Sequence, residues 1–172
     1  MKQRILWMTR TAVLLALLIA LQAATKPLGQ LVTGSCVNLV LGVAALFGGG
    51  WCGAAVALLS PLFAFLLGIG PALPQLVPMI AAGNTVLILL LRLPGQSAAV
   101  KRCLAVLTSA AGKFLALYLL IVKLTLPLLN LPEKQTAMLA ASFTWPQLLT
   151  ALIGGALAMA ICPVLKKALL RK

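Results

Sequence analysis

The feature that most constrains this sequence is a succession of long apolar segments separated by short clusters of Gly, Pro and Asn. The six segments run over residues 5–24, 35–47, 50–68, 72–92, 100–125 and 146–168. A helix needs about 20 residues to cross a bilayer, so only the second segment is short, and we expect it to extend into its flanks. The pattern predicts an all-α integral membrane protein, a bundle of six transmembrane helices in one domain spanning 1–172.

The breaks between the segments contain the residues that end helices. They are "TKPLGQ" (25–30), "GGGW" (48–51), "GIGPALP" (68–74), "RLPGQS" (92–97) and "NLPEKQT" (130–136). Pro removes a backbone N–H, and Gly adopts the conformations that follow a helix end. We expect short connections at these five places and no separate soluble domain.

Composition agrees with a membrane-embedded chain. Hydrophobic residues make up 63% of the sequence and charged residues 9%, whereas soluble domains are about 45–50% apolar and about 25% charged. The first segment resembles a secretory signal, but it is long enough to span and further spans follow it. We therefore expect it to be a retained helix.

The charged residues are almost all basic, with fourteen Lys and Arg against a single acid and no His. They lie mainly at the ends of the apolar segments, which the positive-inside rule explains without a nucleic-acid partner. With the N-terminus in the cytoplasm, the inner side holds ten: Lys2, Arg4, Arg10, Arg92, Lys101, Arg102, Lys166, Lys167, Arg171 and Lys172. The outer side holds three, Lys26, Lys123 and Lys134. This asymmetry predicts a multi-pass protein of the cell membrane with both termini cytoplasmic.

Several kinds of chemistry are missing from the sequence. The only carboxylate side chain, Glu133, lies outside the spans, so a proton relay built on intramembrane carboxylates or histidines is not expected. The four scattered cysteines form no CxxC pair and have no His beside them, which disfavours a metal site. Neither a phosphate-binding loop nor an acid–base pair around a nucleophile is present. We expect no enzymatic activity and no cofactor, and active transport would need energy from a partner.

The first segment carries alanines at intervals of four residues, which we call the alanine ladder: Ala12, Ala16, Ala20 and Ala24. Residues at this spacing share one face of a helix, and small side chains allow another helix to approach closely in lipid. The ladder is compatible with an external partner helix and with packing inside the same chain.

Polar residues gather toward the predicted outer side of the spans. The candidate solute-binding set is Lys113, Asn84, Asn38, Gln75, Tyr118, Trp145, Gln147 and Gln30. Together these would line a cavity open to the outside, in which a few polar groups on an apolar wall hold a ligand. The alternative is that Trp145 anchors the chain at the interface and that the amides bond across helices.

Lys113 is the most unusual member of this set. It lies eleven residues after Arg102, or roughly 16 Å along a helix that rises about 1.5 Å per residue, and therefore near mid-membrane. A lipid-exposed lysine at that depth costs about 2.5–3.5 kcal/mol, so we expect its side chain to face the bundle interior. Its partner would be amides such as Asn84, with the lysine charged or neutral, or an anionic or acceptor group on a solute. We hypothesise the last, with snorkelling to an interface as a further alternative.

The architecture resembles that of the substrate-binding S components of energy-coupling factor (ECF) transporters. The resemblance covers nearly the whole chain and includes the phrases "GSCVNLVLGVAALFGGGWCGAAVALLSPLFAFLLGIGP" (34–71) and "QLVPMIAAGNTVLILLLRL" (75–93). It implies capture of a vitamin or similar micronutrient from outside and delivery to a coupling membrane subunit driven by two ATPases. It also implies that an AxxxA motif on the first helix, here Ala12 with Ala16 or Ala16 with Ala20, makes the docking contact. The absence of His disfavours a metal substrate, because the nickel and cobalt branch relies on histidine ligands.

Two rival functions remain open from the sequence. A self-contained channel or facilitator would need a polar path through both leaflets, and a non-transporting scaffold would use its polar groups only to pair helices.

Overall fold

The computed structural model describes residues 2–93 and 98–169, and all regular elements in these two ranges are helical. The elements are α1 (Lys2–Thr25), η1 (Lys26–Leu28), α2 (Gln30–Val43), η2 (Ala44–Gly48), α3 (Gly50–Leu66), α4 (Leu76–Arg92), α5 (Ala99–Leu117), η3 (Tyr118–Thr125), α6 (Leu126–Leu128), α7 (Glu133–Ser142) and α8 (Trp145–Leu169). Here η1 is a 3-10 turn, whereas η2 and η3 are π-helical continuations of α2 and α5.

Every predicted apolar segment is helical. The second one extends as expected, beginning at Gln30 and continuing through η2 to Gly48. The fourth begins later than predicted, at Leu76, because residues 70–75 form an irregular loop. Most of the predicted break at 92–97 lies outside the described residues.

One prediction was wrong: part of the break at 130–136 is not a loop but the first turn of α7. Pro132 occupies the N-cap position, and Glu133 stands in the first turn without a basic residue in the last. Pro is well tolerated where a helix begins, and an acid there interacts favourably with the helix dipole. The residues that suggested a break therefore mark the start of a helix.

Four helical stretches are long and apolar enough to cross a membrane: Gln3–Leu28, Gln30–Gly48, Ala99–Leu128 and Glu133–Leu169. The helices α3 and α4 are also apolar but have 17 residues each. At about 1.5 Å per residue they extend roughly 26 Å, slightly less than the approximately 30 Å of a typical hydrocarbon core.

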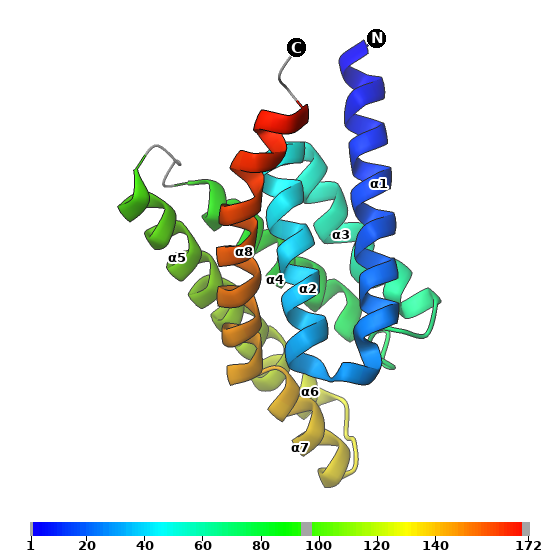
Figure 1. Cartoon of the computed structure of the whole chain (residues 1–172). Coiled ribbons are helices and arrows are strands. Elements are labelled where there is room, and N and C mark those ends of the chain that lie inside the picture. The colour runs from blue at the N-terminus through cyan, green and yellow to red at the C-terminus, as the bar shows by residue number, and fades with distance from the viewer. Residues whose placement is uncertain (1, 94–97, 170–172) are drawn as a thin grey trace.

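The six apolar helices pack as a closed ring in the order α1, α2, α8, α5, α4, α3 and back to α1. Both termini lie at the same end of this bundle, whereas α7 and the turn between α1 and α2 lie at the other (Figure 1). We call these the terminal end and the loop end. Consequently α1 contacts only α2 and α3 among the long helices, and the rest of its surface faces outward.

Glycines allow α2 and α8 to approach very closely. A Cβ atom built on Gly154 of α8 would lie 2.6 Å from the backbone nitrogen of Leu39 and 2.7 Å from the carbonyl oxygen of Ser35. A Cβ on Gly42 of α2 would lie 2.5 Å from that of Ala158. Only Gly fits at these positions, so the two helices come together along their length.

Two apolar clusters fill the bundle. The larger one, the terminal-end core, includes Leu41, Val56, Leu87 and Ala158 and joins α1, α2, α3, α4, α5 and α8. The smaller one, the loop-end cluster, consists of Leu76, Leu117, Ile121, Leu126 and Phe143. Buried apolar side chains from all six helices thus fill the terminal end, apart from a hollow of about 340 Å³ beside Gly50, Thr85 and Arg92, and the loop end is only partly filled.

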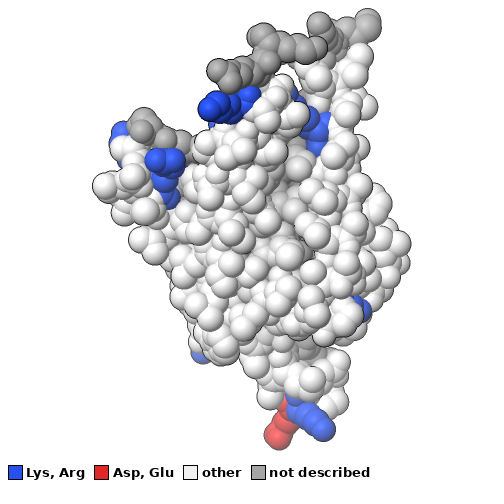
Figure 2. Space-filling view, viewed as in Figure 1, with Lys and Arg blue, Asp and Glu red and all other residues white. Residues whose placement is uncertain are grey.

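Charged side chains, like apolar ones, are distributed unevenly between the two ends of the bundle. Figure 2 shows the Lys and Arg side chains gathered mainly at the terminal end, with the single acidic group at the tip of the loop end beside a basic one. Because Glu133 is the only acid in the sequence, this tip is the start of α7. Arg171 and Lys172, two of the ten predicted inner basic residues, lie outside the described residues.

Candidate functional site

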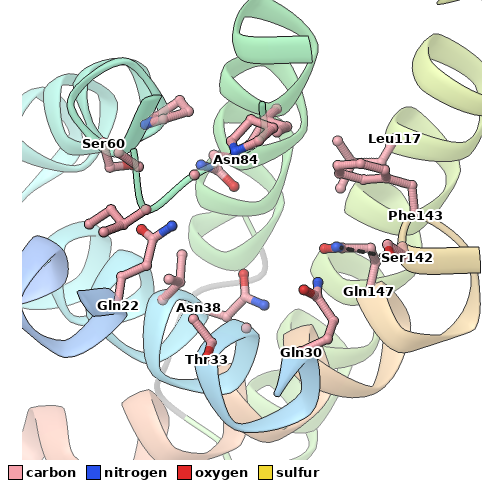
Figure 3. Close-up of a pocket in the computed structure, with 18 of the residues that line it drawn as sticks. Gln22, Gln30, Thr33, Asn38, Ser60, Asn84, Leu117, Ser142, Phe143 and Gln147 are labelled. Atoms are coloured by element: carbon pink, nitrogen blue, oxygen red, sulfur yellow. Dashed lines mark hydrogen bonds between the residues drawn. The ribbon is translucent and has the colours of Figure 1, made fainter. Parts of the chain in front are cut away.

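A cavity of about 330 Å³ lies at the loop end, between the two apolar clusters. This volume is at the lower end of the range of about 300–1,000 Å³ that is typical of small-molecule pockets. Its lining comes from α1, η1, α2, α3, α4, α5, α7 and α8, so it is a product of the whole ring. Figure 3 shows the polar side chains of several of these elements directed toward one common space.

Lys113 lies at the base of the cavity and is 3% exposed. Its ammonium donates to the carbonyl oxygen of Asn38 at 2.6 Å and to that of Asn84 at 2.8 Å. The expectation that this side chain faces the interior is confirmed. The two amides come from α2 and α4; of these only α4 is a neighbour of α5 in the ring, so Lys113 reaches across the bundle to Asn38.

The close approach of α2 and α8 positions one of these amides. Asn38 is 1% exposed, and its Nδ2 donates to the Thr150 hydroxyl of α8 at 3.2 Å. Thr150 in turn donates to the Gln147 carbonyl oxygen, one turn earlier on α8. A chain of hydrogen bonds therefore joins α5, α2 and α8 across the base.

Ser60 of α3 also lines the cavity and is 2% exposed. Its Oγ is the one buried side-chain N or O atom in the described residues that has no hydrogen-bond partner. Buried hydroxyl groups are nearly always paired, and an unpaired one costs about 1–3 kcal/mol. An unpaired hydroxyl in a cavity wall is available to a bound molecule.

Apolar side chains and an exposed rim complete the cavity. Leu117 and Phe143, both from the loop-end cluster, form part of its wall. At the rim, the exposed Lys26 donates to the carbonyl oxygen of Gly68 at 2.9 Å, which connects the α1–α2 turn to the end of α3. Gly68 has φ +69°, a conformation that favours Gly. The cavity thus opens at the loop end and is closed toward the termini by the terminal-end core.

Five of the eight predicted site residues meet in this cavity: Lys113, Asn84, Asn38, Gln147 and Gln30. The first four are buried, whereas Gln30 is exposed at the rim. Gln147 also donates from Nε2 to the Ser142 carbonyl oxygen at 3.1 Å, as Figure 3 shows. Residues up to 117 positions apart in the sequence therefore share one lining.

Gln75, Tyr118 and Trp145 do not line the cavity. Gln75 is exposed in the loop that precedes α4, and Trp145 is 59% exposed at the start of α8. Tyr118 stacks on Phe114 with ring centroids 6.0 Å apart and lies beneath the Lys123 ammonium. The depth of each residue was estimated from the sequence, but the face of the helix on which it lies was not.

Five polar residues of the lining lie outside the predicted set of eight. These are Gln22 of α1, Lys26 of η1, Thr33 of α2, Ser60 of α3 and Ser142 of α7. Gln22 is the only amide side chain within the first apolar segment, and this could have identified it as a lining residue. Ser60 precedes Pro61 inside an otherwise apolar helix and resembles any small packing residue, so no sequence pattern distinguished it.

The structure places the alanine ladder on the outside of the bundle. All four of its alanines are exposed, whereas the inward face of α1 consists of Thr11, Leu14 and Leu18. The alternative that the ladder packs within the same chain is therefore wrong. In the described ranges, no group of three His, Cys, Asp or Glu residues is arranged to hold a metal ion.

No protein-family model matches this sequence, and comparison with curated proteins and with solved structures finds no significant match. The site must therefore be interpreted from its own geometry and chemistry.

Proposed function

We propose that this chain is the membrane-embedded specificity subunit, or S component, of an ECF-type importer. In this proposal it spans the cell membrane six times, with both termini in the cytoplasm and the loop end outside. It captures a small organic micronutrient, a vitamin or a precursor, and delivers it by docking onto a coupling subunit that two ATPases drive. The single observation that carries the proposal is a cavity, polar at its base, that opens at one end only.

The one-sided cavity favours a binding subunit over a channel or facilitator. Those functions need a polar route through both leaflets, but toward the termini the bundle is filled by the terminal-end core, where Leu41, Leu87 and Leu91 are fully or almost fully buried. A scaffold protein would need no cavity, and an unpaired buried hydroxyl in its wall would have no use. The chain also lacks a phosphate-binding loop, so any energy for uptake comes from a partner.

The outward alanine ladder supports the docking step. Small residues on an outward face let a second helix approach to backbone contact, and van der Waals packing then stabilises the pair within lipid. Because α1 contacts the remainder of the bundle through only two helices, a partner can cover this face without disturbing the cavity. The orientation is supported by the basic residues at the terminal end.

The proposal is tested by recovering the bound solute. The chain is expressed alone, purified in detergent and denatured, and the released small molecules are identified by mass spectrometry. We expect one organic compound in stoichiometric amount, which then rebinds to the empty protein without any ATPase present. A chain that neither releases nor rebinds any compound would contradict the proposal and favour the scaffold.

A mutation in the ladder separates docking from binding. Ala16→Trp should block close approach of the coupling subunit, so uptake by cells falls while solute binding by the isolated chain is unchanged. The control is Val13→Trp, which enlarges an exposed residue beside the ladder rather than in it. Equal loss of binding and uptake in Ala16→Trp would mean that the ladder supports the fold instead.

A further inference from the structure

The base of the cavity is rich in hydrogen-bond donors that have no acceptor. An ammonium group has three N–H donors, and Lys113 uses two of them on the Asn38 and Asn84 carbonyl oxygens. Within the described residues, its third donor has no protein acceptor. The lysine is therefore held in place by the protein but not fully satisfied by it.

The two amides add to this excess of donors. Both carbonyl oxygens accept from Lys113, so both NH₂ groups point away from it. The lysine therefore fixes which way each amide is oriented. The NH₂ group of Asn38 is used by Thr150. That of Asn84 makes no hydrogen bond to the described residues and, unlike the Ser60 hydroxyl, is not fully enclosed, so it borders the open cavity. Two different side chains thus offer unused N–H groups at the base.

Ser60 supplies a third, independent observation. Its hydroxyl is buried, lines the same cavity and has no partner, although a hydroxyl can donate as well as accept. It comes from α3, whereas Lys113 and Asn84 come from α5 and α4. Groups on three helices therefore line one pocket with donors that are free to bind an acceptor on a captured molecule.

The charge of the lining is entirely positive. It contains Lys113 at the base and Lys26 at the rim, and no Asp or Glu. Lys26 is exposed, but Lys113 is a buried lysine whose partners are neutral amides. An ammonium in a low-dielectric site is costly unless an opposite charge meets it, so an anion at the base would stabilise the charged form of Lys113.

Resting on the proposed function, we infer that the captured solute carries a single carboxylate group and that this group binds at the base to Lys113, Asn84 and Ser60. A carboxylate only accepts hydrogen bonds and has about four lone-pair sites, which matches a lining of unused donors. One negative charge balances the one buried ammonium, whereas a phosphate dianion would leave an uncompensated charge. The remainder of the solute then packs against Leu117 and Phe143 and reaches the amides at the rim.

The inference is tested with three probes that share a phenyl ring, are similar in size and differ in charge: benzoate, benzamide and benzylamine. Thermal unfolding of the detergent-purified chain is followed at increasing concentration of each probe, at constant ionic strength. Stabilisation by a ligand that binds only the folded state gives an apparent Kd. We expect the Kd of benzoate to be at least about tenfold lower than that of benzamide, with no stabilisation by benzylamine.

Two variants show whether benzoate binds at the proposed base. Lys113→Gln should abolish the preference for benzoate over benzamide. Ser60→Ala should weaken benzoate binding severalfold without lowering the unfolding temperature measured without probe, because the hydroxyl has no protein partner to lose. Should Lys113→Gln fail to fold, Ser60→Ala alone still decides whether the base is involved.

Three results would overturn the inference: equal stabilisation by benzoate and benzamide, stronger stabilisation by benzylamine, or a benzoate effect that neither variant reduces. The first would mean that water satisfies the donors, and the last that the anion binds elsewhere. Recovery of a neutral or cationic compound from the purified chain would also overturn it while leaving solute capture intact. Recovery of no compound at all bears on the proposed function instead, so the two failures can be told apart.

Discussion

The two ends of this bundle are built from the same six helices but are stabilised in different ways. At the terminal end, Leu, Val and Ala side chains from all six helices pack into one continuous core. At the loop end the same helices surround a cavity with a lysine and two amides at its base. The terminal end is stabilised by close packing, whereas the base of the cavity is stabilised by hydrogen bonds to groups that lipid cannot provide.

Comparison of the two ends shows that polar side chains, rather than loose packing of apolar ones, define the cavity. A lysine at this depth excludes apolar neighbours from its head group and requires acceptors around it. The glycines of α2 and α8 bring Asn38 into reach of Thr150. Close packing of one helix pair thereby creates the polar site beside it.

The largest expected effect is a difference in chemical labelling between the two ends, which the proposal places on opposite sides of the membrane. In a background without native cysteines, a cysteine placed at Lys134 should react with a membrane-impermeant reagent in intact cells. A cysteine at Lys166 should react only after the cells are permeabilised, because the proposed orientation places the basic terminal end in the cytoplasm. The reverse labelling pattern would invert the assignment of the two ends.

Truncating the terminal-end core should cost the most stability. Leu41→Ala removes a fully buried side chain and should lower the free energy of unfolding by about 2–5 kcal/mol. Thermal or denaturant unfolding in detergent measures the loss. The exposed Leu17→Ala is the matched control and should change stability by about 0.5 kcal/mol or less.

Removing the lysine should cost less and should reveal coupling at the base. Lys113→Met leaves two buried carbonyl oxygens without a donor, and we expect a loss of about 1–3 kcal/mol. In a double-mutant cycle, Asn84→Leu combined with Lys113→Met should cost at least about 1 kcal/mol less than the sum of the single changes. Additive losses would show that the hydrogen bond contributes nothing to stability.

The smallest effect is expected at the polar residues outside the cavity. Gln75→Ala alters an exposed loop residue that neither lines the cavity nor makes a side-chain hydrogen bond in the described ranges. Its unfolding temperature and its response to solute should match those of the unmodified chain, within about 0.5 kcal/mol. A clear loss of solute binding would extend the site to the loop before α4.

Much of the fold could be predicted because lipid imposes a simple rule on sequence. Every span must be apolar and helical, so the Gly and Pro clusters at 25–30, 48–51 and 68–74 were enough to place the ends of the first four apolar helices approximately. The inward position of Lys113 followed from the cost of exposing its charge to lipid. Helix α7 was missed because a Pro before an acid is compatible with a break and with a helix start.

The site was harder to predict because it depends on which face of each helix turns inward. Tyr118 and Asn84 both lie at plausible depths, yet only the side chain of Asn84 reaches the cavity. That outcome depends on the rotation of α4 and α5, which neighbouring glycines such as Gly83 and Gly112 allow to pack closely. Ser60 could not be identified from the sequence, because what distinguishes it is that its buried hydroxyl has no hydrogen-bond partner.

The hydrogen bonds of Lys113 also have a consequence for synthesis. Chains are made from the N-terminus, so in the proposed six-span topology α2 and α4, which carry Asn38 and Asn84, enter the membrane before α5 leaves the ribosome. Lys113, the side chain that is most costly to insert into lipid, therefore finds its two acceptors in place when α5 is inserted. Thr150, on the last helix, follows and completes the network. A circular permutant that made α5 first would have to insert a lysine with no partner in the bilayer.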